Sequence, residues 1–154
     1  MPRMGGVARR ATILGEYRRR HADTPMLVVE TGNELKQSDN LEDPANRWIL
    51  EAFDLLGSHA INITPADLRR LNRLAEKDLI PQERQRQYLA SVVELSSASR
   101  LPVKPYVIQR LSPDQGGDEI RIGILAVSLV TPGSEQVGKI LDVETALKRY
   151  VPEV

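Results

Sequence analysis

Three polar side chains stand where a sheet protein could use them for chemistry. Glu30 and Asn33 come at the end of a short apolar run, 26–29, and Asp67 follows a second apolar run further along the chain. Open α/β sheets place their ligands at the carboxyl ends of strands. Carboxylate and amide oxygens at such an end can bind divalent cations. Glu30, Asn33 and Asp67 are therefore the positions to consider, as vestigial ligand positions, although the sequence assigns no catalytic or metal-binding residue.

Each of these residues also has a structural interpretation. Gly32-Asn33 is an ordinary turn dipeptide, so Glu30 and Asn33 are predicted to be the polar turn that follows a strand. Thr64 precedes Asp67 by the spacing of a reciprocal helix cap. We expect Asp67 to cap a helix rather than to bind a metal.

The other residues with catalytic potential are few. His21 and His59 are the only histidines. His21 is predicted to end a helix, where a partly cationic ring suits the helix dipole. His59 is predicted to begin a strand without an acid or a second histidine to help it, so we expect a surface or capping role. The arginine clusters at 18–20 and 69–73 are interpreted as solvated helix faces.

Composition narrows the function further. Hydrophobic residues make up 41% and charged residues 27% of the chain, which is typical of a globular protein. Lys plus Arg equals Asp plus Glu at 21 each, so charge gives no reason to expect nucleic-acid or anionic-membrane binding. The absence of cysteine excludes disulfides, cysteine-ligated zinc and thiol catalysis.

The sequence also bears on location. No apolar run approaches the roughly 20 residues of a membrane helix, so we expect no membrane span. Residues 1–6 contain no apolar core of a signal peptide. We expect a cytoplasmic protein by default, or a periplasmic or extracellular one if the N-terminus is incomplete.

Apolar periodicity and turn residues predict alternating helices and strands. Helices are expected at 7–20, 44–56 and 142–150 and from 65 onward, and strands at 26–29, 60–63, 88–95, 103–111 and 119–127. Trp48 and Phe53 are placed on the apolar face of the second helix, and Gly57 ends it in a left-handed conformation. The run 119–127 is the most hydrophobic and is expected to be central. The predicted fold is one α/β domain over 1–154, a layered sheet with flanking helices.

Read with these elements, the sequence resembles the calcineurin-like metallophosphoesterases of the 5′-nucleotidase type. Residues 5–11, Gly-Gly-Val-Ala-Arg-Arg-Ala, are similar to a Gly-Gly-Leu-Ala-Arg-Arg-Ala helix of that group, which leads into an Asp-x-Gly-Asp metal-binding turn. Looser matches follow in the family's order, at 52–57, 60–68, 88–91, 105–108, 121–127 and 141–154. The resemblance implies the first half of a metallophosphoesterase α/β sandwich.

The family's chemistry is a two-metal hydrolysis of phosphoesters, which needs a bridging carboxylate and further Asp, Asn and His ligands. Glu30 and Asn33 stand where the resemblance places the two acids of the turn, and Pro65-Ala66 stands where it places an Asn-His pair. The family's opening metal strand would precede Gly5, and its later His motifs would follow Val154. The resemblance therefore implies a truncated, degenerate domain without metal ligands or cofactor, which is catalytically inactive and acts as a structural or partner-binding module.

Two alternatives remain open. The first is a metal-dependent phosphohydrolase, of the 5′-nucleotidase or phosphodiesterase type, with two divalent metals (Mn, Zn or Fe) in a site rebuilt around Glu30, Asn33, Asp39 and Asp67. The second is that the chain is one part of a longer or split enzyme. The half-fold has a consequence of its own. Without the second sheet that downstream sequence supplies in the family, the run 120–127 is expected to leave an exposed apolar face or sheet edge, which predicts a homo-oligomer or a complementary chain.

Overall fold

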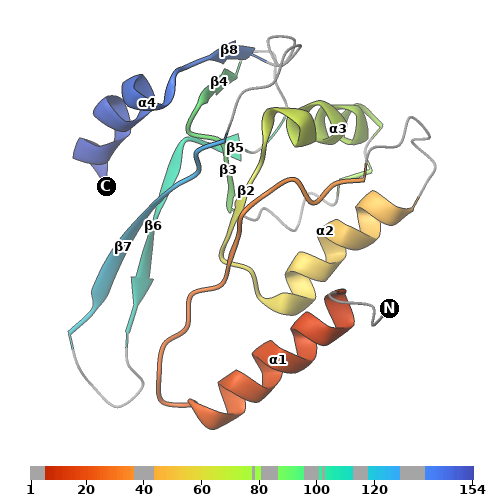
Figure 1. Ribbon diagram of the computed structural model, residues 1–154, viewed down its shortest axis with the longest axis vertical. Helices are drawn as coiled ribbons and strands as arrows, with labels where there is room; N and C mark the ends of the chain where they lie inside the picture. The colour runs from red at the N-terminus through yellow and green to blue at the C-terminus, as the bar shows by residue number, and fades with distance from the viewer. Residues whose placement is uncertain are drawn as a thin grey trace, which may run out of the picture.

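The computed structural model describes residues 6–36, 44–77, 79–80, 87–95, 101, 103–112, 118–128 and 138–154. Within these ranges helices and strands alternate through the first half of the chain, as predicted (Figure 1). The elements are α1 (Val7–Arg20), β1 (Val29–Glu30), α2 (Ala45–Leu56), β2 (Ala60–Asn62), α3 (Pro65–Glu76), β3 (Gln87–Leu89), β4 (Val93–Leu95), β5 (Val103–Lys104), β6 (Tyr106–Leu111), β7 (Ile120–Leu125), β8 (Gly138–Ile140), α4 (Val143–Tyr150) and the 3-10 turn η2 (Val151–Glu153).

A parallel sheet with the strand order β1-β2-β3-β5 forms the centre of the fold. Its register pairs Glu30 with Ile61 and Ile61 with Tyr88, so these three side chains share one face. Val29 pairs with Ala60 and lies on the opposite face. The register therefore turns Glu30 toward one layer and Val29 toward the other, which confirms the predicted layered α/β fold.

The face that carries Ile61 and Tyr88 is covered by α2 and α3. The side chains buried there from the two helices are Leu50, Phe53, Leu68, Leu71 and Leu74. Local sequence signals fix where these helices begin and end. Thr64 and Asp67 form the predicted capping box at the start of α3, and Gly57 adopts the predicted left-handed conformation after α2, with φ 68°.

The opposite face of the sheet packs against the β6–β7 hairpin (Figure 1). Ala60 and Leu89 of the sheet contact Val107 and Ala126 there. Ser91, which is fully buried, joins the two layers: its Oγ accepts a hydrogen bond from the backbone N–H of Ala126 at 2.7 Å and donates one to the carbonyl of Pro105.

The prediction that 119–127 is a central strand is wrong. Among the described residues β7 pairs only with β6, in a two-stranded antiparallel sheet, and Ile120 is 52% exposed. Alternate residues of a hairpin strand face opposite sides. The number of apolar residues along such a strand therefore does not distinguish a central strand from a half-covered one.

Other strands are shorter than predicted. The run 26–29 contributes only Val29 to β1, and Val29 is half exposed rather than covered on both faces. The chain turns after Leu89, so 88–95 divides into β3 and β4, and β4 pairs with β8, which was not predicted. The run 103–111 divides into β5 and β6 at Pro105, which has no N–H to donate to a ladder.

Two helices bury less than their periodicity predicts. α1 has no buried residue, although it is helical over the predicted range. In α2 the predicted apolar face is right for Phe53 but wrong for Trp48, which is 64% exposed. Trp48 and Leu55 lie seven residues apart, which places them on the same outer face of the helix.

Candidate functional site

The carboxyl ends of β1 and β2 lead into the turns that carry the predicted site residues. After Glu30 the chain makes a sharp turn in which Gly32 (φ 93°) and Asn33 (φ 60°) both have left-handed backbone conformations. A Cβ atom on Gly32 would lie 2.7 Å from the carbonyl oxygen of Asn62, so β2 passes too close for any other residue. Asn tolerates the left-handed region better than most residues do.

Glu30 is buried and faces the helix layer. Its side chain forms an ion pair with Arg10 of α1, and its Oε1 accepts a hydrogen bond from the Ser58 hydroxyl at 2.8 Å. The carboxylate is 2% exposed, whereas the Arg10 side chain is 37% exposed. A buried carboxylate needs a compensating charge and hydrogen-bond donors. Both carboxylate oxygens of Glu30 have such partners within the chain.

Asp67 is the most highly connected side chain of the site, and it too is buried. Its Oδ2 accepts from the Thr64 hydroxyl (2.7 Å), the Asn33 backbone N–H (2.9 Å) and the Thr64 backbone N–H (3.3 Å), and its Oδ1 accepts from the Leu35 backbone N–H (3.3 Å) and Arg70 Nη1 (3.4 Å). Arg70 also donates to the carbonyl of Leu35 at 3.0 Å. Asp67 therefore caps α3 and also fixes the turn after β1.

The structure brings two of the three predicted site residues together and places the third elsewhere. Asn33 meets Asp67, but through its backbone N–H, while the Asn33 residue as a whole is exposed. Glu30 is bonded to α1 and to the segment before β2. Asp39 lies outside the described residues. Arg70, interpreted from sequence as part of a solvated face, instead has a side chain that is 16% exposed and pairs with Asp67.

Asn62 is a site residue that sequence reasoning missed. Its Nδ2 donates to the carbonyl of Thr31 at 2.9 Å, and its Oδ1 accepts from the Ser128 hydroxyl at 3.1 Å. The amide thus links the end of β2, the turn after β1 and the segment after β7. A polar residue at the end of an apolar strand is the only signal that could have identified it.

A pocket of about 340 Å³ lies beside Asn62, on the hairpin side of the sheet. Its walls are largely apolar and come from β1, β2, β3 and β7 with the residues that follow them: Val29, Glu30, Thr31, Ala60, Asn62, Leu89, Ile124, Leu125, Ala126 and Val127. Glu30 is the one acidic or basic residue in this lining, but its side chain faces the helix layer, where it pairs with Arg10.

We tested whether the described residues fit the two metal ions that the predicted resemblance implies. Among the described residues, no group of three or more His, Cys, Asp or Glu side chains is placed to hold a metal ion. The oxygens of Glu30 and Asp67 already accept hydrogen bonds or an ion pair from the chain itself. This donor set does not fit a two-metal centre.

Within the described ranges, no helix is both long and apolar enough to cross a membrane.

Comparisons with known proteins rest on the fold. No protein-family model and no curated protein matches the sequence. The 5′-nucleotidase precursor of Thermus thermophilus matches the structure with a TM-score of 0.70 and 17% identity, over 97% of this chain and 29% of that one. NAD nucleotidase of Haemophilus influenzae matches with a TM-score of 0.65 and 16% identity, over 96% of this chain and 30% of that one. The chain therefore spans less than a third of the length of either protein.

Proposed function

We propose that this chain is a structural or partner-binding module without the metal chemistry of the calcineurin-like metallophosphoesterases. The proposal starts from the fold that the chain shares in part with the two nucleotidases. We also propose that 1–154 is a single domain. The observation that supports the main proposal is the bonding of Asp67, whose two oxygens accept five hydrogen bonds from the chain itself.

Metal binding by Asp67 would have to compete with those hydrogen bonds. A cation would replace donors that cap α3 and hold the turn after β1, and these donors would then be left unpaired in a buried position. An unsatisfied buried donor costs about 1–3 kcal/mol. Asp67 is thus better suited to hold the fold than to hold a metal.

The other two positions support the same proposal. Glu30 is charge-neutralised by Arg10 within the helix layer. Asn33 contributes its backbone to the Asp67 bonds and carries a neutral amide, which cannot compensate two divalent charges as a carboxylate does. Glu30 therefore has a structural role through its side chain, and Asn33 has one through its backbone.

Metal titration tests the proposal directly. We expect calorimetric titration of the full chain with Mn²⁺ and with Zn²⁺ to show no stoichiometric binding, and elemental analysis of the same sample to agree. Binding of about two ions per chain that is lost in Asp67→Asn and retained in Asp142→Asn would overturn it. Asp142 is the matched control, because it also accepts hydrogen bonds at the start of a helix.

The fold likeness also supports a second candidate, a metal-dependent phosphohydrolase with a site rebuilt around Glu30, Asn33, Asp39 and Asp67. This candidate predicts hydrolysis of bis(p-nitrophenyl) phosphate or of a nucleotide in the presence of Mn²⁺, abolished by Asn33→Ala. Absence of turnover with Mn²⁺, Zn²⁺ and Fe²⁺, in a sample whose circular dichroism shows folded protein, would exclude it.

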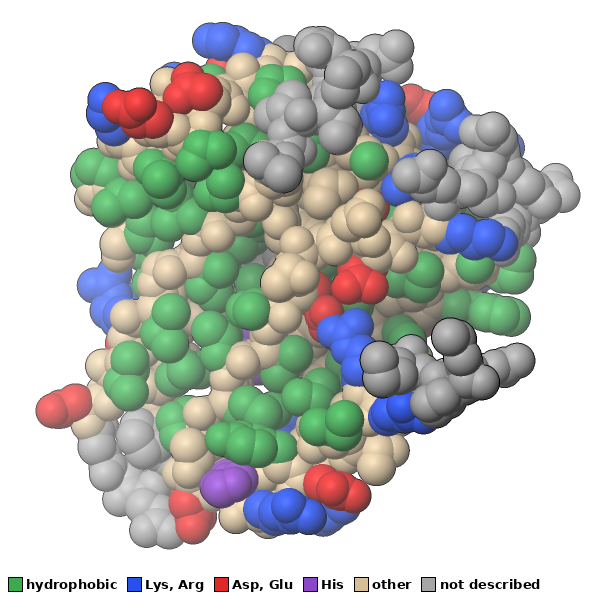
Figure 2. Space-filling view, in the orientation of Figure 1, with side chains coloured by type: hydrophobic (Ala, Val, Ile, Leu, Met, Phe, Trp, Pro, Cys, Tyr) green, Lys and Arg blue, Asp and Glu red, His purple; other side chains and the backbone are tan. Residues whose placement is uncertain are grey.

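We further propose that the hairpin side of the sheet is the partner surface. Val29, Ile120 and Val127 are large apolar residues that remain 38–52% exposed there. Figure 2 shows hydrophobic side chains over the hairpin region of the face in view. Exposed apolar residues beside an open sheet edge favour association. Light scattering is expected to detect dimers or larger species, and a clean monomer at high concentration would contradict this.

A further inference from the structure

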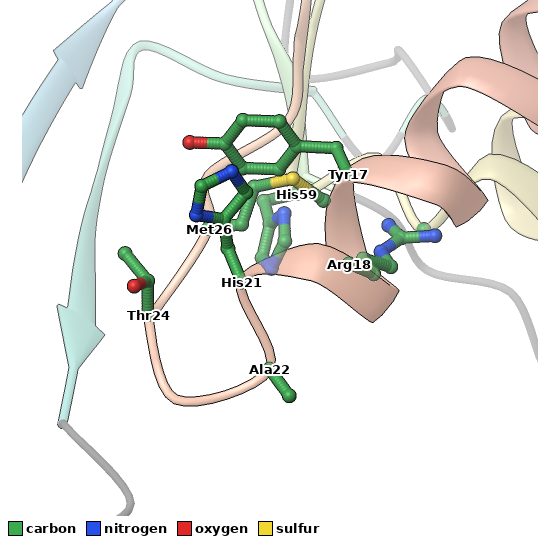
Figure 3. A pocket seen from close by; sticks show the side chains of 8 residues that line it. Tyr17, Arg18, His21, Ala22, Thr24, Met26 and His59 are labelled. Carbon is green, nitrogen blue, oxygen red and sulfur yellow. The ribbon is translucent and has the colours of Figure 1, made fainter.

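A second pocket, of about 350 Å³, lies at the amino ends of the parallel strands, whereas the candidate site lies at their carboxyl ends. It is formed where α1 and α2 end and where β1 and β2 begin. The residues that line it are Tyr17, Arg18, His21, Ala22, Thr24, Met26, Gly57 and His59 (Figure 3). Its volume lies at the small end of the range of about 300–1,000 Å³ for small-molecule sites. The structure thus corrects the expectation that His59 has no second histidine beside it, because both histidines line this one pocket.

One wall of the pocket is aromatic. The rings of Tyr17 and His21 stack at a centroid distance of 4.4 Å with 31° between their planes. The two residues lie one helical turn apart at the end of α1, which brings their side chains together. Both residues are exposed, so the rings are accessible to a ligand from solvent. Because the two rings stack on each other, the pocket meets only the outer faces and edges of the pair, and such aromatic surfaces favour planar rings.

His59 supplies a hydrogen-bond donor. Its Nδ1 accepts a hydrogen bond from the backbone N–H of Val28 at 3.1 Å. In neutral imidazole one nitrogen accepts and the other carries the hydrogen. The Val28 contact therefore assigns the hydrogen to Nε2, which makes Nε2 a donor and excludes it as a metal ligand in this state.

Arg18 supplies a positive charge. Its Nη2 donates to the carbonyl of Leu56 at the end of α2, at 2.7 Å. Gly57 leaves the room for this contact, since a Cβ there would lie 2.7 Å from the same Nη2. In Figure 3 the Arg18 guanidinium lies on the other side of the pocket from the Tyr17 and His21 rings, and His59 lies between them.

Three carbonyl acceptors at the helix ends beside the pocket are already bonded within the chain. The carbonyl of Leu56 is bonded to Arg18, the carbonyl of Tyr17 to the N–H of His21, and the carbonyl of His21 to the N–H of Thr24. None of the eight lining residues is acidic. The pocket therefore combines two aromatic rings with the hydrogen-bond donor of His59 and the positively charged guanidinium of Arg18.

We propose that this pocket binds a small aromatic anion, with its ring against Tyr17 and His21 and its carboxylate or phosphate toward Arg18 and His59. The guanidinium fork matches either oxyanion. The inference goes beyond the proposed function, since it concerns the other end of the parallel strands and holds whether or not the candidate site binds metal.

A probe series tests the charge and the ring separately. The full chain, labelled with ¹⁵N-histidine, is titrated with benzoate, phenyl phosphate, benzamidine, cyclohexanecarboxylate and inorganic phosphate while the imidazole resonances are followed. Only two histidines are present, so both signals report on the pocket. Benzoate or phenyl phosphate is expected to shift both imidazole signals. The probe of these two that binds more tightly identifies the preferred oxyanion.

The other probes define the expected specificity. Benzamidine carries a similar ring with the opposite charge, and cyclohexanecarboxylate carries the charge without the aromatic ring. Each is expected to bind at least about tenfold more weakly than the better aromatic anion, as is inorganic phosphate. No shift with either aromatic anion, or equally tight binding of benzamidine, would overturn the proposal. The proposal would also be overturned if, in the protein without ligand, the His59 imidazole carried its hydrogen on Nδ1.

Two variants complete the test. Tyr17→Leu removes one ring of the stacked pair at an exposed position, and we expect about tenfold weaker binding of the aromatic anion. Arg20→Gln is the matched control, because Arg20 lies in the same last turn of α1 but outside the pocket, where it pairs with Glu16 at 3.7 Å. Unchanged binding in Tyr17→Leu, or an equal loss in Arg20→Gln, would contradict the proposed site.

Discussion

Two helix starts in this protein use the same pair of residue types at the same spacing. At α3 the order is Thr64 then Asp67, and at α4 it is Asp142 then Thr145. In both, the aspartate accepts a hydrogen bond from the threonine hydroxyl, at 2.7 Å in α3 and 2.6 Å in α4. Asp67 is buried, whereas Asp142 is exposed.

The difference between the two lies in what else each aspartate holds. Asp142 bonds within its own helix start. Asp67 also accepts from the backbone of the turn after β1 and from Arg70. The same local motif thus acts as a simple cap at the surface and as a tertiary junction in the interior. Burial and long-range partners, rather than the motif, decide how much the aspartate contributes.

The largest expected effect is that of Asp67→Ala. The substitution leaves the N–H groups of Asn33 and Leu35 without this acceptor and removes the carboxylate beside Arg70, so we expect a loss of about 3–5 kcal/mol in the free energy of unfolding. Urea unfolding followed by circular dichroism measures it. Asp142→Ala is the matched control and is expected to shift the midpoint much less. Equal shifts would show that burial does not distinguish the two caps.

Arg10→Met sharpens the comparison with a second buried carboxylate. Of its partners in the described part of the chain, Glu30 would keep only the Ser58 hydroxyl. We therefore expect a loss of about 2–4 kcal/mol in the free energy of unfolding, below that of Asp67→Ala because Arg10 is partly exposed. Adding Glu30→Gln should restore part of the stability by removing the unpaired charge. A double variant no more stable than Arg10→Met would argue against this ion pair as the cause.

Acid titration of Asp142 is expected to show a smaller effect. The Thr145 hydroxyl, followed by the Thr145 backbone N–H, holds the pKa of the Asp142 carboxyl below its usual range. With the folded pKa depressed, its contribution is complete above the ordinary Asp pKa of about 3.9 and is lost as the pH falls through the folded pKa. A carboxyl resonance titrating at or above the ordinary value would contradict this, and Thr145→Val should raise the pKa.

The smallest expected effect concerns Glu94 of β4. A hydrogen bond from Arg149 of α4 holds the pKa of the Glu94 carboxyl below its usual range, and Lys139 also lowers it. Arg149→Gln should move the Glu94 pKa back toward its ordinary value and change stability little, because exposed ion pairs contribute weakly and are screened by salt. Lys148→Gln, which removes an exposed partner of Glu144, is the control and should leave the Glu94 pKa unchanged.

Local signals were predictable from sequence, and long-range partners were not. The spacing from Thr64 to Asp67 and the glycine after α2 identify helix ends because the interacting groups are close in the chain. The bonds from the turn after β1 to Asp67 cross more than 30 residues, and no periodicity encodes them. For the same reason the pairing of Arg10 with Glu30 was not predicted, although both residues lie in segments that carry the family resemblance.

The exposed position of Trp48 on α2 has a consequence for spectroscopy. It is the only tryptophan in the chain, and more than half of its surface is in contact with solvent in the folded protein. Its fluorescence should therefore be emitted at long wavelength, be readily quenched by acrylamide, and change little when the protein unfolds. Tyr88, buried against α2 and α3, is the ring whose near-ultraviolet signal should follow the loss of the core.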